Sequence, residues 1–161
     1  MSKISLLFVC LGNICRSPTA HAVFQALVDS QGLTEKISVD SAGTGDWHLG
    51  RAPDRRAQKH AMIRNYDMSA LRARLVVQQD FHQFDYILAM DHSNFSDLEA
   101  MQPPNTSCKL SLFLEYCQNP TFADYQEVPD PYYGGDSGFE LVLDLVEDAS
   151  AGLLEHIKAR L

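Results

Sequence analysis

The segment from Ile4 to Phe24 constrains the fold of this chain more than any other. It begins with an apolar run, Ile4 to Val9, which is typical of a buried central strand. Ser17 and Pro18 then suit the N-cap and the first position of a helix. The apolar residues that follow have helical spacing: Ala20, Val23, Phe24 and Leu27. The segment therefore predicts a strand, a loop and a helix in immediate succession.

The connecting loop, residues 10–17, carries groups that suit phosphate chemistry. In a strand–loop–helix unit, backbone N–H groups and the positive end of the helix dipole converge on one point, which suits an anion or a thiolate. A thiolate such as that of Cys10 is a nucleophile, and the guanidinium of Arg16 can bind two phosphate oxygens. The alternative is a buried structural Cys10 beside a surface Arg16. We call residues 10–17 the phosphate loop: Cys10, Leu11, Gly12, Asn13, Ile14, Cys15, Arg16 and Ser17.

The rest of the chain alternates expected strands with expected helices. Strands are expected at residues 4–9, 37–40, 84–90 and 109–113, with a helical turn at 112–116 as the alternative for the last. Helices are expected at 18–31, 54–65, 92–101 and from 139 onward. This order predicts an α/β fold: one doubly wound domain over residues 1–161, with a four-stranded parallel sheet, flavodoxin-like strand order and helices on both faces. Cys10, Ser41 and Asp91 each follow an expected strand end, so we expect all three to face one crevice.

Charge and composition exclude several classes of function. The net charge of −8 argues against a nucleic-acid or anionic-membrane partner. The four cysteines and six histidines show no zinc-ligand spacing, so we expect no metal and no cofactor. No apolar stretch approaches membrane-spanning length, and Asn13, Arg16 and Pro18 interrupt the run that imitates a signal peptide. We expect a reduced, cytoplasmic protein.

A loop of about 20 residues, 118–138, precedes the last helix, and loops of that length are usually functional. Asp130 lies in it between Pro129 and Pro131, which restrict the backbone and can hold a proton donor over the phosphate loop. A solvated loop carboxylate is the alternative. Ser137 and Glu140 are expected to form a capping box at the start of the last helix.

Four segments resemble the low-molecular-weight protein tyrosine phosphatases. They are Val9–Pro18, Asp40–Thr44, Phe84–Asp91 and Asp130–Gly134, and they follow the family's order over nearly the whole chain. The resemblance implies hydrolysis of phosphotyrosine through a phosphocysteine on Cys10. It also implies that Asp130 first protonates the phenolate and then activates the hydrolytic water.

The resemblance also implies supporting roles around the phosphate loop. Asn13 and Ser41 are expected to hold the loop in shape, and Ser17 to donate a hydrogen bond to the Cys10 sulfur, to cap the helix, or both. Asp91 is either a loop contact or a helix cap. A histidine usually joins this support in the family, and Leu71 stands in its place here. Arg72 and Arg74 are expected at the surface.

Aromatic side chains on two loops are the candidates for substrate selection. Trp47, Tyr132 and Tyr133 would form a deep slot that admits a phosphotyrosine ring and excludes the shorter phosphoserine. The expected partner is a phosphotyrosine-containing protein, and the expected state is a monomer with weak self-association through exposed aromatics. Phosphorylation of the two tyrosines is implied by the resemblance alone. Cys15 is either a redox partner of Cys10 or a small buried hydrophobe.

Two other functions compete with this interpretation. Thioredoxin-coupled arsenate reductases share the loop but relay electrons through two further cysteines, and this chain has none between Cys15 and Cys108. A phosphotyrosine-binding or redox-sensing module without turnover is the second alternative. The intact set of Cys10, Arg16 and Asp130 favours a catalyst.

Overall fold

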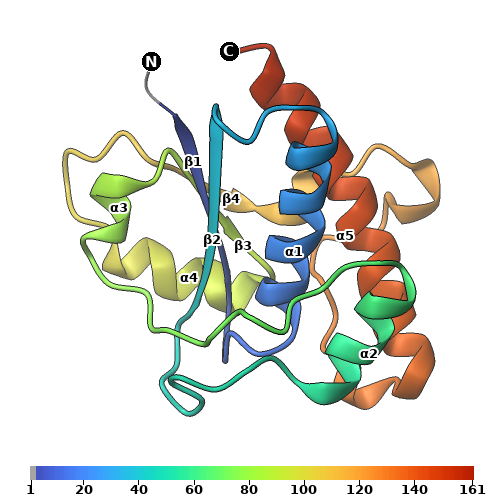
Figure 1. The fold of residues 1–161 in the computed structure, drawn as a ribbon. Helices are drawn as coiled ribbons and strands as arrows, with labels where there is room; N and C mark the ends of the chain where they lie inside the picture. Colours follow the sequence, from blue (N-terminus) through green and yellow to red (C-terminus); the bar gives the residue numbers. More distant parts are fainter. Residues whose placement is uncertain (1–2) are drawn as a thin grey trace.

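The computed structural model describes residues 3–161, apart from the side chain of Tyr133. Its centre is a parallel sheet of four strands in the order β2-β1-β3-β4 (Figure 1). The strands are β1 (Ile4–Cys10), β2 (Ile37–Gly43), β3 (Tyr86–Ala89) and β4 (Lys109–Leu112). The predicted parallel sheet with flavodoxin-like strand order is confirmed.

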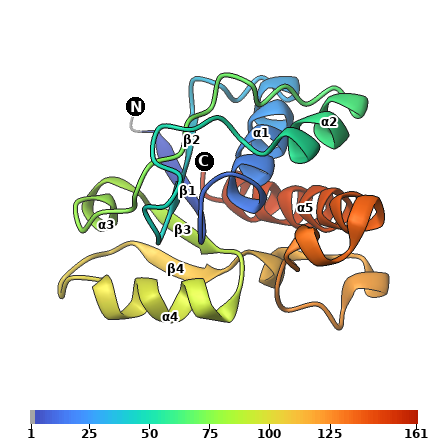
Figure 2. The same ribbon diagram turned by 90° about the horizontal axis from the view of Figure 1, so that it is seen from below.

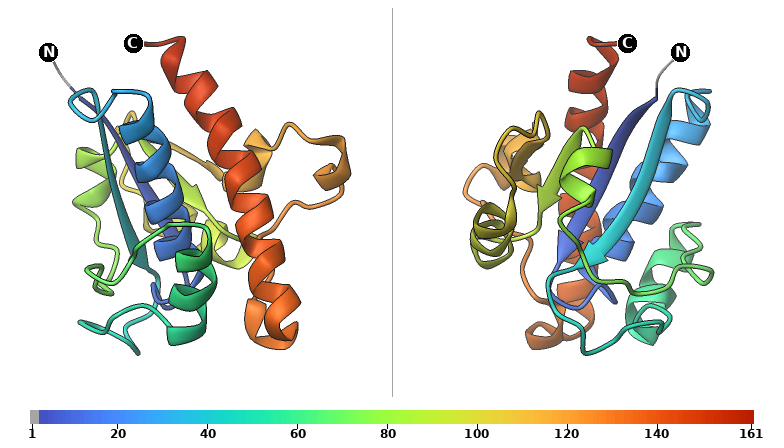
Figure 3. Two further views of the ribbon diagram at one scale, coloured as in Figure 1. Left: turned by 45° about the vertical axis from the view of Figure 1, so that its right-hand side comes forward. Right: turned by 90° about the vertical axis from the view of Figure 1, so that its left-hand side faces the viewer.

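Helices cover both faces of the sheet, as predicted (Figures 1 and 2). One face carries α1 (Arg16–Ser30) and α5 (Gly135–Lys158), and the other carries α3 (Asp80–Gln83) and α4 (His92–Met101). The remaining helix, α2 (Arg55–Ile63), lies near the first turns of α5 (Figure 3). Short 3-10 turns are η1 (Phe113–Tyr116), η2 (Pro120–Phe122) and η3 (Pro131–Tyr133).

The unbroken apolar run of β1 arises because the strand is buried on both faces. Leu6 and Phe8 belong to the core beneath α1 and α5, whereas Leu7 and Val9 belong to the core beneath α4. All four side chains are fully buried. Successive side chains of a strand point to opposite faces, so a strand with helices on both sides needs apolar residues at every position.

The first helix starts earlier than the sequence predicts. It begins at Arg16, and the cap position is Cys15, which makes no side-chain capping bond. Ser17 is therefore a buried residue of the first turn, and the predicted N-cap role of Ser17 is wrong. Its hydroxyl lies instead against Cys10 and Asn13, so the contacts inside the phosphate loop take precedence over capping.

The last helix confirms one prediction and corrects another. The expected apolar stripe is buried in full: Phe139, Val142, Leu143, Val146, Ala149, Leu153 and Ile157. The helix begins at Gly135, however, so Ser137 and Glu140 form no capping box. The Ser137 hydroxyl donates to the carbonyl of Gly134, and Glu140 pairs with Arg64 and His60 of the α2 region. Within residues 3–161, none of the helices has both the length and the apolar character that crossing a membrane requires.

Candidate active site

A cleft of about 330 Å³ opens at the carboxyl end of β1, where the phosphate loop begins. This is the expected position for a ligand site in a parallel sheet, beyond the strand ends. Two segments far apart in the sequence complete the cleft, namely the loop after β2 and residues 129–134, which we call the acid loop. The lining residues are Cys10, Leu11, Gly12, Ile14, Cys15, Arg16, Trp47, His48, Asp130, Pro131 and Tyr132.

Cys10 is the last residue of β1 and its side chain lies at the base of the cleft, with only 3% of the residue exposed. Its Sγ lies 3.0 Å from the hydroxyl oxygen of Ser17 and accepts a hydrogen bond from the backbone N–H of Asn13 at 3.3 Å. The predicted contact between Ser17 and the Cys10 sulfur is therefore present. The sulfur therefore lies between a backbone N–H and a hydroxyl, at the loop that leads into the N-terminus of α1.

Arg16 is the first residue of α1, and its guanidinium lies beneath the cleft. Nη1 donates to Oδ2 of Asp91 at 2.8 Å and to the carbonyl of Val128 at 3.1 Å. Burial acts to lower the pKa of Arg16, but Cys10 and the hydrogen bond to Asp91 raise it above its ordinary value. Among the described residues Nε and Nη2 have no partner, which leaves one edge of the guanidinium available for two phosphate oxygens.

Asp91 performs both of the roles that the sequence left open. It follows β3, and its Oδ1 caps α4 by accepting from the backbone N–H of Asn94 at 2.7 Å. Its Oδ2 accepts from Arg16. The expectation that Asp91 faces the cleft is wrong, because its side chain does not line the cleft but orients the guanidinium that does.

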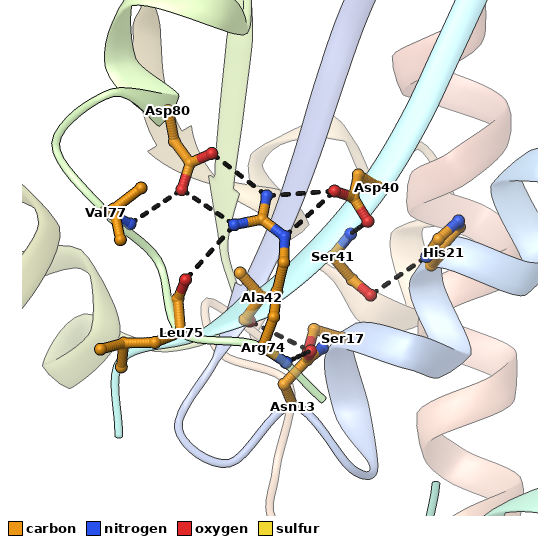
Figure 4. A network of polar contacts seen from close by, with 10 residues as sticks. All are labelled: Asn13, Ser17, His21, Asp40, Ser41, Ala42, Arg74, Leu75, Val77 and Asp80. Atoms are coloured by element: carbon orange, nitrogen blue, oxygen red, sulfur yellow. Dashed lines mark hydrogen bonds and ion pairs between the residues drawn. The ribbon is translucent and has the colours of Figure 1, made fainter. Parts of the chain in front are cut away.

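Asn13 is buried and holds the phosphate loop through hydrogen bonds of its side chain (Figure 4). Its φ of 56° is left-handed, a conformation that Asn adopts more readily than most residues. Nδ2 donates to the Ser17 hydroxyl at 2.8 Å, and Oδ1 accepts from the backbone N–H of Arg74 at 3.0 Å. The support predicted for Asn13 thus has visible partners.

Arg74 is partly exposed, in line with its expected surface position, but its guanidinium is held by ion pairs that the sequence did not indicate. Its guanidinium donates to both oxygens of the buried Asp80 at 3.1 Å and to Asp40 (Figure 4). Burial acts to lower the pKa of Arg74, but the hydrogen bonds to Asp80 and the charge of Asp40 raise it. Its carbonyl accepts from the N–H of Gly43, which ties this segment to the end of β2. No periodic pattern in the sequence pointed to this residue, whereas Arg72 is exposed as predicted.

Ser41 lies within β2 rather than after it, so the expectation that it faces the cleft is wrong. Its hydroxyl lies 3.0 Å from Nδ1 of His21 on α1, and among the described residues it makes no hydrogen bond to the phosphate loop. Burial lowers the pKa of His21, which keeps the ring neutral at this contact. Leu71 packs against the apolar core. The hydrogen bonds described for the loop therefore run through Ser17 and Arg74, and the supporting role of Ser41 stays a prediction.

The acid loop places Asp130 at the rim of the same cleft as Cys10. Its Oδ1 accepts from the backbone N–H of Tyr132 at 3.0 Å, and this bond starts η3. Tyr132 lines the cleft with 42% of its surface exposed, and its hydroxyl donates to Asp54 at 2.9 Å. The side chain of Tyr133 lies outside the described residues, so its predicted place in the slot remains a prediction.

The loop after β2 contributes Trp47 and a residue that sequence reasoning missed. Trp47 is 67% exposed and lines the cleft, as predicted. His48 also lines it and packs over Gly12, where an added Cβ would lie 3.0 Å from the imidazole. In the sequence, only its position next to Trp47 could have indicated that His48 lines the cleft.

Cys15 is free and buried, and it lines the cleft beside Cys10. Burial, and then the neighbouring Cys10, raise the pKa of its thiol above the ordinary value, so it remains protonated. Its redox role remains a prediction. Among the described residues, no group of three His, Cys, Asp or Glu side chains is placed to hold a metal ion.

Comparison with known proteins gives a consistent result. Residues 5–161 match the family model described as low molecular weight phosphotyrosine protein phosphatase. The low molecular weight protein-tyrosine-phosphatase YfkJ of Bacillus subtilis is 42% identical over 96% of each chain. A protein tyrosine phosphatase structure from Entamoeba histolytica superposes with a TM-score of 0.91 at 42% identity, covering 98% of both chains. A Drosophila arginine phosphatase structure gives a TM-score of 0.86 at 34% identity, covering 95% of this chain and 97% of the other.

Proposed function

We propose, because this chain belongs to the low molecular weight phosphotyrosine protein phosphatase family, that it hydrolyses phosphotyrosine in proteins through a phosphocysteine intermediate on Cys10. One observation carries the proposal. A strand end, a helix start and a distant loop bring Cys10, Arg16 and Asp130 to a single cleft. These groups supply the nucleophile, the oxygen clamp and the proton donor that the reaction needs.

In the first step the Cys10 sulfur attacks phosphorus, and the phosphorus–oxygen bond to the tyrosine breaks. The free edge of Arg16 and the N–H groups of the phosphate loop bind the three phosphate oxygens. Asp130 donates its proton to the departing phenolate oxygen. Its place on an exposed turn that lines the same cleft as Cys10 supports this assignment.

In the second step the Asp130 carboxylate takes a proton from water, whose oxygen attacks phosphorus and displaces Cys10. The hydroxyl of Ser17 has one proton and two acceptors, the Cys10 sulfur at 3.0 Å and the Ala42 carbonyl at 3.3 Å. A charged sulfur is the stronger acceptor, so the leaving thiolate receives this hydrogen bond. Ser17 therefore stabilises the leaving group.

The residues that line the cleft are evidence that the substrate carries an aromatic ring. Trp47 and Tyr132 offer ring surfaces at its mouth, which a phosphotyrosine ring can contact while its phosphate reaches Cys10. We further propose a monomeric cytoplasmic enzyme that needs no cofactor. Phosphoarginine is a second candidate substrate, because the Drosophila structure of similar fold is that of an arginine phosphatase.

The test is steady-state hydrolysis of three peptides, carrying phosphotyrosine, phosphoserine or phosphoarginine. Cys10→Ser should abolish turnover, and Asp130→Asn should reduce kcat for phosphotyrosine by about 10²–10⁴-fold, the usual contribution of general acid catalysis. Asp124→Asn, an exposed carboxylate in the same long loop, is the matched control and should keep full activity.

Preference for phosphotyrosine over phosphoserine would support the aromatic slot. Faster hydrolysis of phosphoarginine would replace the proposed substrate. If wild type hydrolyses none of the three peptides, the phosphatase assignment fails, and reduction of arsenate with thioredoxin becomes the next assay.

A further inference from the structure

Asp54 joins the three segments that surround the cleft, although it does not line the cleft itself. Its backbone N–H donates to the carbonyl of Ile14 in the phosphate loop at 2.7 Å. Its Oδ1 accepts from the N–H groups of Arg56 at 2.9 Å and Ala57 at 3.1 Å, which caps α2. Its Oδ2 accepts from the hydroxyl of Tyr132 at 2.9 Å. One carboxylate therefore ties the acid loop to a helix that is itself tied to the phosphate loop.

Tyr132 transmits this connection to Asp130. The backbone N–H of Tyr132 donates to Oδ1 of Asp130 at 3.0 Å, while its hydroxyl reaches Asp54. The described contacts omit the side chain of Tyr133. Among them, the bond from the Tyr132 hydroxyl to Asp54 is the one side-chain hydrogen bond that joins residues 129–134 to a segment distant in sequence. Burial and the neighbouring Asp54 raise the pKa of Tyr132, so the hydroxyl remains a donor.

The ring of Tyr132 is also held by packing. The guanidinium of Arg56 lies 5.1 Å from the ring centre of Tyr132 and 5.0 Å from that of Phe139 on α5. The two rings meet edge to face at 6.4 Å. Arg56 lies two residues after the Asp54 cap, so the same start of α2 fixes the hydroxyl and the ring face of Tyr132.

We propose that Asp54 is a positioning residue for the reaction: through Tyr132 it holds the acid loop so that Asp130 can reach the leaving oxygen above Cys10. The inference rests on the proposed function. A general acid works only within hydrogen-bond reach of the oxygen it protonates, and small displacements of such a group are costly. Asp130 itself is exposed and lies on a short turn, so its orientation depends on what anchors that turn.

The experiment compares two esters in the full chain, phenyl phosphate with a poor leaving group and p-nitrophenyl phosphate with a good one. Asp54→Ser keeps a capping oxygen for α2 but is too short to reach Tyr132. We expect kcat/KM for phenyl phosphate to fall about tenfold and that for p-nitrophenyl phosphate about twofold, because kcat/KM reports cleavage of the ester bond, where only the poor leaving group needs the proton. Asp54→Asn keeps both a cap and a hydrogen-bonding group toward Tyr132, and should retain near wild-type rates.

Tyr132→Phe breaks the same hydrogen bond without touching the cap of α2, so it tests the proposal even if Asp54→Ser folds poorly. It should show the same selective loss, and the double variant should be no slower than either single variant. Asp67→Ser and Tyr125→Phe, both exposed and away from the cleft lining, are matched controls. Equal losses on both esters, or none, would overturn the positioning role. A wild type inactive on both esters would overturn the proposed function as well.

Discussion

At the scale of single residues, the site is built from side chains that each make two contacts. Asp91 caps α4 with one oxygen and orients Arg16 with the other. Asn13 donates to Ser17 and accepts from Arg74 while keeping a left-handed backbone. Each such residue couples a local conformation to the geometry of the cleft. Substitution should therefore change stability and catalysis together.

Substitutions at Asn13 can separate the effect on stability from the effect on catalysis. Asn13→Gly removes both side-chain hydrogen bonds but permits the φ of 56°, whereas Asn13→Ala removes the bonds and forces a methyl-bearing residue into left-handed geometry. We expect both variants to lose about tenfold in kcat because the loop around Cys10 loosens. The Ala variant should also be about 1 kcal/mol less stable than the Gly variant. Urea unfolding and p-nitrophenyl phosphate kinetics measure the two effects, and an Ala variant as stable as the Gly variant would contradict the strain argument.

At the scale of elements, α5 supports the acid-loop side of the cleft and packs closely against η1. The helix is buried along most of its length and contacts both η1 and η3. The helix comes very close to η1 at Gly152, where an added Cβ would lie 1.9 Å from the carbonyl oxygen of Tyr116. A glycine in the middle of a helix is unfavourable by itself, so close packing explains its presence here.

Gly152→Ala should therefore destabilise the protein even though alanine is the better helix former. We expect a loss of about 2–3 kcal/mol in the free energy of unfolding, because the backbones of α5 and η1 would have to separate. Ala151→Gly, at the exposed neighbouring position, should cost about 1 kcal/mol through helix propensity alone. Thermal unfolding followed by circular dichroism compares the two. A Gly152→Ala variant more stable than wild type would show that the helix can shift without cost.

At the scale of the whole molecule, the sheet separates two apolar cores. Cys15 belongs to the core under α1 and α5, and Cys108 to the core under α4. Both cores include side chains of β1, which alternate between the two faces. A shared central strand favours one cooperative unit over two independent ones.

We predict that both cores unfold in a single transition, as the expected single domain over residues 1–161 requires. Pulsed alkylation of the thiols at increasing urea concentration, read by mass spectrometry, reports on each core separately. Cys15 and Cys108 are both buried, so they should become reactive at the same urea concentration. Exposure of Cys108 well before Cys15 would show that the α4 side unfolds independently.

The sequence predicted the elements whose signals are local. The apolar run of β1 with the loop after it, the stripe of α5 and the cap at Asp91 all appear as expected, because periodicity and capping act between residues close in the chain. The parallel sheet followed from the alternation of such elements. Cys10, Arg16 and Asp130 were identified because their residue types and flanking prolines indicate a chemistry before any fold is known.

The tertiary structure alone decided which distant groups meet. Ser17 contacts the Cys10 sulfur instead of capping its helix, Arg74 supports Asn13, and Asp54 holds Tyr132 from 78 positions away. Ser41 contacts His21 and lies within a strand, because β2 continues to Gly43 instead of ending at Asp40. Hydrogen bonds between separate segments produce no regular spacing of residues from which they could be predicted, because the partners meet only after the sheet has brought the loops together. The candidate residues were therefore readable from local sequence, whereas the contacts that position them depended on the fold.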